Sequence, residues 1–61
     1  MVQPEDYVIN KNGEVIGKVI AIDSEKDMAK IYRYDLNKNK EDLELPTYIY
    51  QKFDSIIVKE Q

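Results

Sequence analysis

The side chains that could do chemistry in this chain are carboxylates, lysines, two serines and five tyrosines, because the sequence contains no histidine and no cysteine. A serine nucleophile needs a general base within hydrogen-bonding distance, and histidine is the usual one. Ser24 falls in a polar stretch typical of a turn, and Ser55 lies at the start of an expected strand. We therefore expect no catalytic residue, no cofactor and no enzymatic activity.

One polar stretch resembles the beginning of a calcium-binding loop. Asp35, Asn37 and Asn39 supply oxygen donors at alternate positions, as such loops do. The pattern then fails, because Lys40 stands where the loop needs glycine and Pro46 stands where it needs a bidentate glutamate. We expect these side chains to cap their own turns, and we predict no metal site.

The tyrosines offer a different chemistry, that of binding. Tyr32 and Tyr34 share one face of an expected strand with Lys30, and Tyr48 and Tyr50 come shortly before the last expected strand. Tyrosine rings beside cations can stack on bases, form the centre of a protein interface, or cover a core with their hydroxyl groups in water. These five residues are the candidate binding site, and the sequence leaves all three interpretations open.

The only two glycines of the chain organise the first part of the expected fold. Asn12-Gly13 follows a β-branched and aromatic run at residues 7–10 and predicts a hairpin turn of type I′, in which both residues have positive φ. The next expected strand, residues 14–23, is apolar on both faces. Gly17 within it indicates a bend, because glycine weakens a strand unless a bulge, a bend or a close backbone approach requires it.

The rest of the chain predicts three more strands and one short helical turn. These elements are expected as a strand at 28–35, a loop at 36–40, a strand at 42–45, a helical turn at 46–52 and a strand at 53–59. We therefore predict an all-β domain over residues 1–61, a small five-stranded bent-sheet barrel of the Src-homology-3 type. The alternative is an open five-stranded sheet that dimerises.

The run from Asn12 to Asp23 resembles the opening of a PRC-barrel domain, which has a glycine hairpin, a Gly-Lys-Val step and a strand that ends in Asp. Residues 45–58 resemble the last turn and strand of that family, so the resemblance covers about half of the chain. It implies a small β-barrel that serves as an adaptor or accessory module, with no common catalytic residue. Peptide-binding Src-homology-3 domains match less well, because this chain has no tryptophan to line a slot for a polyproline helix.

Charge and hydropathy narrow the classes of partner. Twelve acidic residues against nine basic ones give a net charge of −3, which disfavours nonspecific binding to nucleic-acid phosphates. The longest apolar run, residues 19–22, is far shorter than the roughly 18 residues that indicate a membrane span. The acidic first residues are unlike a signal peptide, and no cysteine points to an oxidising compartment. We expect a cytoplasmic protein with no membrane partner.

Together these features predict a non-enzymatic binding or adaptor module. It would contact another protein, or a second copy of itself, through a surface made of Lys30, Tyr32, Tyr34, Tyr48 and Tyr50. Two alternatives stay open. One is a nucleic-acid-associated accessory protein, and the other is an acidic inhibitor that occupies the basic groove of its target.

Overall fold

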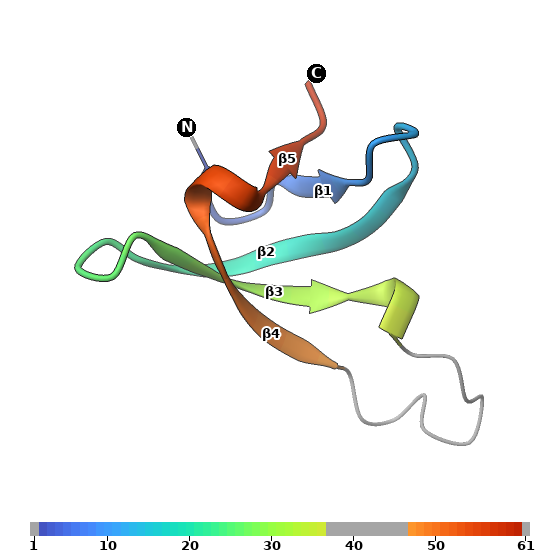
Figure 1. Cartoon of the computed structure of the whole chain (residues 1–61). Helices are drawn as coiled ribbons and strands as arrows, with labels where there is room; N and C mark the ends of the chain where they lie inside the picture. Colours follow the sequence, from blue (N-terminus) through green and yellow to red (C-terminus); the bar gives the residue numbers. More distant parts are fainter. Residues whose placement is uncertain (1, 37–46, 61) are drawn as a thin grey trace.

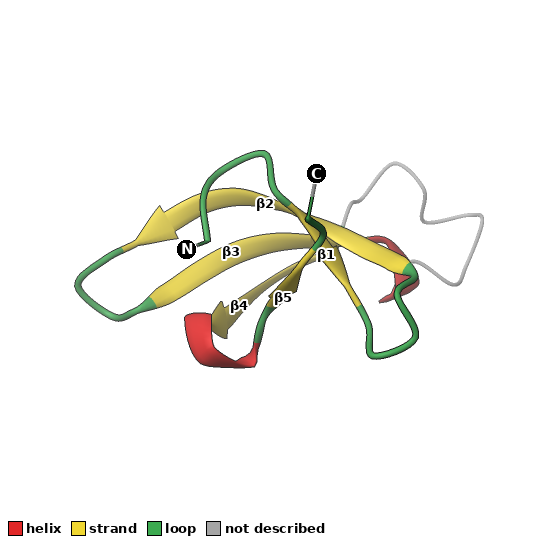
Figure 2. Cartoon of the chain, turned by 90° about the horizontal axis from the view of Figure 1, so that it is seen from above, coloured by secondary structure: helices red, strands yellow, loops and turns green. Residues whose placement is uncertain are grey.

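Five antiparallel strands form one sheet in the computed structural model, which describes residues 2–36 and 47–60 (Figure 1). The strands are β1 (Tyr7–Ile9), β2 (Val15–Asp23), β3 (Met28–Arg33), β4 (Tyr48–Lys52) and β5 (Ile57–Val58). Two short 3₁₀ turns, η1 (Tyr34–Leu36) and η3 (Phe53–Ser55), follow β3 and β4 and lie toward opposite ends of the sheet (Figure 2). The prediction of an all-β fold with five strands is confirmed, whereas the helical turn before the last strand lies at Phe53–Ser55 and not at the predicted residues 46–52.

The sheet is open. Its strand order is β4-β3-β2-β1-β5, so that β4 and β5 are the two edges and do not pair with each other. The predicted closed barrel is therefore wrong, and the topology is that of an open five-stranded sheet. The physical reason lies in β5, whose two residues pair with Val8 and Ile9 of β1 and make too short a strand to close a ladder against β4.

β2 is the central strand, and two β-bulges bend it into the curve seen in Figure 1. On the β1 side, Ile16 is the extra residue between the partners of Val8 and Ile9. On the β3 side, Ile20 is the extra residue next to Val19. Each bulge shifts the side-chain alternation by one residue. This is why β2 is apolar on both faces when it is read with a strict period of two.

Gly17 lies where β2 pairs on both sides at once, with Val8 of β1 and with Arg33 of β3. A Cβ at this position would come closer to the Tyr32 carbonyl oxygen than van der Waals contact allows, and would lie 3.0 Å from Cγ2 of Ile31. The close approach of the β3 backbone therefore requires the glycine. The bend predicted at Gly17 comes from the bulges beside it.

The first hairpin turn differs from the predicted type I′ turn. Gly13 has a φ of +84°, but Asn12 does not have a positive φ. The Gly13 N–H donates to the Asn10 carbonyl at 3.0 Å, and the Asn10 N–H donates to the Glu14 carbonyl at 2.9 Å. This is the pattern of a three-residue loop that ends in a left-handed glycine. The Asn10 side chain stabilises the loop, because its Oδ1 accepts hydrogen bonds from the N–H groups of Asn12 and Glu14.

Residues 48–52 form a strand, although the sequence predicts a helical turn there. Ile49 packs against the core, whereas Tyr48 and Tyr50 are exposed, so the segment alternates with the period of two that a strand requires. Pairing with β3 along the whole of β4 stabilises this extended form. The prediction of a helical turn was wrong because it rested on local turn signals. Pairing with β3, which is distant in the sequence, cannot be read from those signals.

Two strands also differ from the prediction by more than one residue at a boundary. The last strand, predicted at 53–59, is only Ile57–Val58, because η3 occupies Phe53–Ser55. The third strand, predicted to reach residue 35, ends at Arg33, where η1 begins. The strand predicted at 42–45 and most of the loop predicted at 36–40 lie outside the described residues.

The core lies on one side of the sheet and is small. Among the described residues, the fully buried hydrophobic side chains are Val8, Val19, Ala29 and Ile31. The partly buried side chains that pack against them are Val2, Ile16, Ile22, Ile49, Phe53 and Ile56. Because each fully buried aliphatic side chain stabilises a fold by roughly 1.5–3 kcal/mol, a core of this size supports a domain of modest stability.

We predict that Gly17→Ala destabilises the protein much more than Gly13→Ala does. At position 17 the added methyl group collides with the β3 backbone, whereas at position 13 it meets nothing within 4 Å. We expect a loss of about 3 kcal/mol at position 17 and of about 1 kcal/mol for the left-handed backbone at position 13. Urea unfolding followed by circular dichroism measures both, and equal losses would contradict this account of Gly17.

Candidate binding surface

One cross-strand row carries tyrosine and lysine across four strands. Tyr7 of β1 pairs with Lys18 of β2. Lys18 also pairs with Tyr32 of β3, and Tyr32 pairs with Tyr48 of β4. Directly paired residues lie on the same face of a sheet. Val8, the chain neighbour of Tyr7, is buried in the core, so the row lies on the opposite, outer face.

A second group of side chains lies beside this row. Lys30 pairs with Tyr50, whose side chain is 62% exposed, and also with Ala21 of β2. Tyr34 belongs to η1, but its ring centroid lies 5.0 Å from that of Tyr32, with the two rings nearly perpendicular. All five tyrosines of the chain therefore gather on the outer face.

We call this surface the tyrosine face. It contains all five residues that the sequence proposed and two more, and its members are Tyr7, Lys18, Lys30, Tyr32, Tyr34, Tyr48 and Tyr50. Tyr7 and Lys18 are the two that were not predicted from the sequence. With the three-residue loop that the structure shows, a ladder without a bulge would place Gly17 opposite Tyr7. The bulge at Ile16 moves Lys18 into that position. The Asn12-Gly13 hairpin signal could have found this pair, because a two-residue turn there pairs Lys11 with Glu14 and therefore Tyr7 with Lys18.

Tyr32 is the centre of the tyrosine face. It is half-buried and touches Tyr34 on one side and Tyr48 on the other, with a distance of 5.5 Å between the ring centroids of Tyr32 and Tyr48. The Lys30 ammonium lies 4.8 Å from the centroid of the Tyr48 ring. Edge-to-face rings and cations over rings are both attractive arrangements. These contacts hold the rings in place within the single chain.

The charge of Lys18 is neutralised locally. Its Nζ lies 2.7 Å from Oε2 of Glu5 and 5.7 Å from the centroid of the Tyr7 ring. The hydrogen bond that the Lys18 ammonium donates to Glu5, and the negative charge of that carboxylate, raise the pKa of Lys18 above its ordinary value. The Tyr7 end of the tyrosine face is therefore aromatic and close to electrically neutral.

Arg33 and Asp35 form a separate pair. Arg33 alternates with Tyr32 and so belongs to the other side of β3, and its Nε donates to Oδ1 of Asp35 at 2.7 Å within a two-pronged contact. The hydrogen bonds to Asp35 raise the pKa of the guanidinium. Asp35 was the first donor of the calcium-like stretch, whose later members lie outside the described residues. Within residues 2–36 and 47–60, no three acidic, histidine or cysteine side chains gather as a metal site would need.

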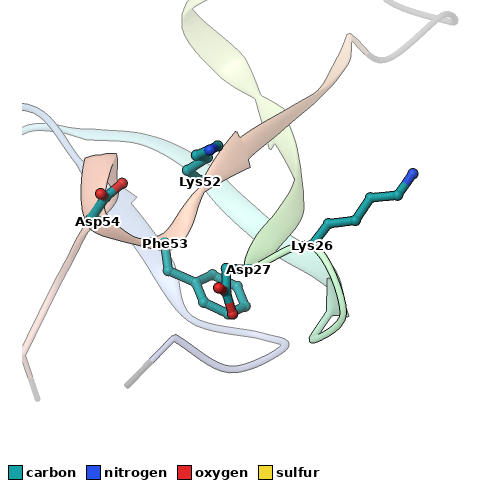
Figure 3. A pocket seen from close by; sticks show the side chains of 5 residues that line it. All are labelled: Lys26, Asp27, Lys52, Phe53 and Asp54. Carbon is teal, nitrogen blue, oxygen red and sulfur yellow. The ribbon is translucent and has the colours of Figure 1, made fainter.

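A hollow of about 300 Å³ lies between η3 and the turn that joins β2 to β3 (Figure 3). Its lining residues are Lys26, Asp27, Lys52, Phe53 and Asp54. The charged ends of Lys26, Lys52 and Asp54 point away from one another in Figure 3, so they do not converge on a common ligand. The Phe53 N–H donates to the Asp27 carbonyl at 2.9 Å, which makes this contact a structural one. We assign no binding site to it.

Comparison of the chain with protein-family models, with curated proteins and with solved structures finds no match. The fold itself defines the class, which is a small all-β protein built on one open antiparallel sheet. Across the described ranges, no helix has the length and apolar character needed to cross a membrane.

We predict that Glu5→Gln lowers the pKa of Lys18 toward its ordinary value, because the substitution removes the carboxylate that raises it. Since the pKa is raised in the folded state, the stability that this pair contributes is complete at neutral pH and is lost as the pH rises through the pKa of Lys18. Titration of the Lys18 side chain by NMR, in wild type and in Glu5→Gln, measures the shift. Identical titration curves would show that Glu5 does not control Lys18.

Proposed function

We propose that this chain is a non-enzymatic binding module that contacts another protein through the tyrosine face. The observation that carries the proposal is the exposure of large apolar side chains on one side of the sheet. Tyr7, Tyr48 and Tyr50 are each at least 44% exposed there, and Tyr34 is 41% exposed. Contiguous exposed apolar surface on a small domain marks an interaction site more often than a solvated face.

The apolar surface continues past the tyrosines toward the β1 edge. Ile9 pairs with both Val15 and Ile57, and alternation puts these residues on the same outer face as Tyr7. Val15 and Ile57 are also exposed. The patch therefore runs across all five strands, a width that suits a folded protein or a long extended segment better than a small molecule.

The charges on this surface favour a protein partner over a nucleic acid. Single-strand binders place cations along a track for the phosphates and stack bases on aromatic rings. Here Lys18 is paired with Glu5, and Lys30 lies over the ring of Tyr48. The chain also carries a net charge of −3. Tyrosine burial is the interaction that this surface can supply most strongly, and tyrosine is among the residues enriched where binding energy concentrates.

A distant relation to small barrels of the Src-homology-3 or PRC type is part of the proposal. Two features support it. The first strand of the chain pairs with the last, β1 with β5, and a 3₁₀ turn comes directly before the last strand. Modules of this size act through one exposed surface, which agrees with an adaptor role. The relation concerns topology, since the sheet of this chain is open.

The proposal predicts that a photoreactive benzoylphenylalanine at position 34 cross-links the protein to a specific polypeptide in its native cell. The paired substitution Tyr34→Ser with Tyr48→Thr should weaken binding to that polypeptide by at least about 30-fold, since interface tyrosines are among the costliest side chains to truncate. Tyr34→Phe with Tyr48→Phe should retain most of the affinity, because the rings are kept. Isothermal titration with the identified partner measures each variant.

Lys11→Gln serves as a control, because Lys11 is exposed in the loop between β1 and β2 and lies outside the apolar patch. Equal binding by wild type and by the Ser/Thr pair would overturn the proposal. Cross-linking to nucleic acid would favour the alternative function, and so would binding of a labelled oligonucleotide with an affinity that falls steeply as salt is added.

A further inference from the structure

The ladder between β3 and β4 determines which backbone groups of the outer edge are already used. Two hydrogen bonds of 2.9 Å bracket β4, one from the Arg33 N–H to the Thr47 carbonyl and one from the Phe53 N–H to the Asp27 carbonyl. In an antiparallel pair, residues that bond across the ladder alternate with residues that do not. The odd-numbered residues of β4 therefore bond to β3.

The even-numbered residues Tyr48, Tyr50 and Lys52 consequently direct their N–H and C=O groups away from the sheet. Within the described part of the chain, only one of these groups has a partner, the Lys52 carbonyl, which accepts a hydrogen bond from the Ser55 hydroxyl at 2.8 Å. The strand around Tyr50 thus presents an open ladder, which is a template for another strand.

The two edges of the sheet differ as templates. β5 has only two residues, whereas β4 has five, and the central residue of β4 carries the most exposed of the large hydrophobic side chains. A longer edge forms more hydrogen bonds with an added strand and fixes its register better. β4 is therefore the edge that a partner strand would cover.

We propose that β4 pairs with β4 of a second copy of this chain, antiparallel and centred on Tyr50. In this register Tyr50 lies opposite Tyr50 of the second copy, and Tyr48 lies opposite Lys52 of the second copy. The two Tyr50 residues then exchange both of their outward hydrogen bonds, and each Tyr48 carbonyl accepts one from the Lys52 N–H of the other copy. The Lys52 carbonyl keeps its hydrogen bond to the Ser55 hydroxyl of its own copy. This inference goes beyond the proposed function, because it uses the backbone of the edge and leaves the rest of the tyrosine face available.

Side-chain chemistry selects this register and this partner. Lys52 is the one charged residue of β4, and antiparallel pairing places it opposite the uncharged Tyr48 of the second copy. Parallel pairing would instead place Lys52 beside Lys52, and like charges directly opposite destabilise a sheet.

The pairing also closes on itself. A two-fold interface uses the same edge of both copies, so the assembly stops at a dimer. The edges that remain are the two short β5 strands, which are poor templates for further growth. The dimer would join two tyrosine faces into one continuous surface and would supply buried area that the small core of one copy lacks.

The test compares Tyr50→Pro with Tyr50→Thr by sedimentation equilibrium from micromolar to millimolar concentration. Proline removes an N–H that makes no bond within one copy, whereas threonine keeps the N–H and removes the ring. We expect wild type and Tyr50→Thr to form dimers, and Tyr50→Pro to dimerise on the order of 100-fold more weakly, because two hydrogen bonds of the interface are lost. Circular dichroism establishes that each variant is folded.

Amide hydrogen exchange of the wild type gives a second measurement that does not depend on how proline is tolerated. Protection of the Tyr50 amide should rise with protein concentration much more steeply than that of the Ile49 amide, which already bonds to β3 within one copy. A wild-type monomer at all concentrations would overturn the proposal, as would concentration-independent exchange at Tyr50 or full dimerisation of a folded Tyr50→Pro. A monomer that still cross-links through position 34 would overturn edge pairing alone and leave the proposed function standing.

Discussion

The close approach of the β3 backbone to Gly17 is the constraint on which the two ladders of β2 depend. At this residue β2 pairs with Val8 on one side and with Arg33 on the other, and a side chain there would displace the Tyr32 carbonyl. The bulges at Ile16 and Ile20 lie on either side of this point and bend the strand between its two partners. β2, the longest strand of the sheet, can therefore pair with β1 and β3 at once although the core that stabilises the sheet is small.

The same bulges decide which side chains the protein shows to its surroundings. Without the extra residue at Ile16, Lys18 would not lie opposite Tyr7, and the row of tyrosine and lysine would be interrupted at β2. With the extra residue, Val19 and Ile22 of β2 pack on the core while Lys18 lies in the outer row opposite Tyr7. The tyrosine face is thus a consequence of the register that the core imposes.

The two interactions we propose draw on different parts of the same residues. Binding of a partner protein uses the rings of the tyrosines, and pairing of two copies uses the backbone of β4. Tyr48 and Tyr50 take part in both, because an edge strand presents side chains on one face and hydrogen-bonding groups along its rim. A dimer built in this way would enlarge the binding surface without covering Tyr7 or Tyr34.

The sequence by itself determined the local features of this protein. Alternating β-branched and aromatic residues predicted most of the first three strands, Gly13 marked the hairpin, and the period of two placed Lys30 and Tyr32 on one face. Only the tertiary structure decided that Tyr48–Lys52 is a strand, that the sheet stays open, and that Tyr48 and Tyr50 pair with Tyr32 and Lys30 on the outer face. The physical reason is that a turn or an alternation depends on neighbours in the chain. Ladders and bulges instead depend on strands that meet only after the chain has folded.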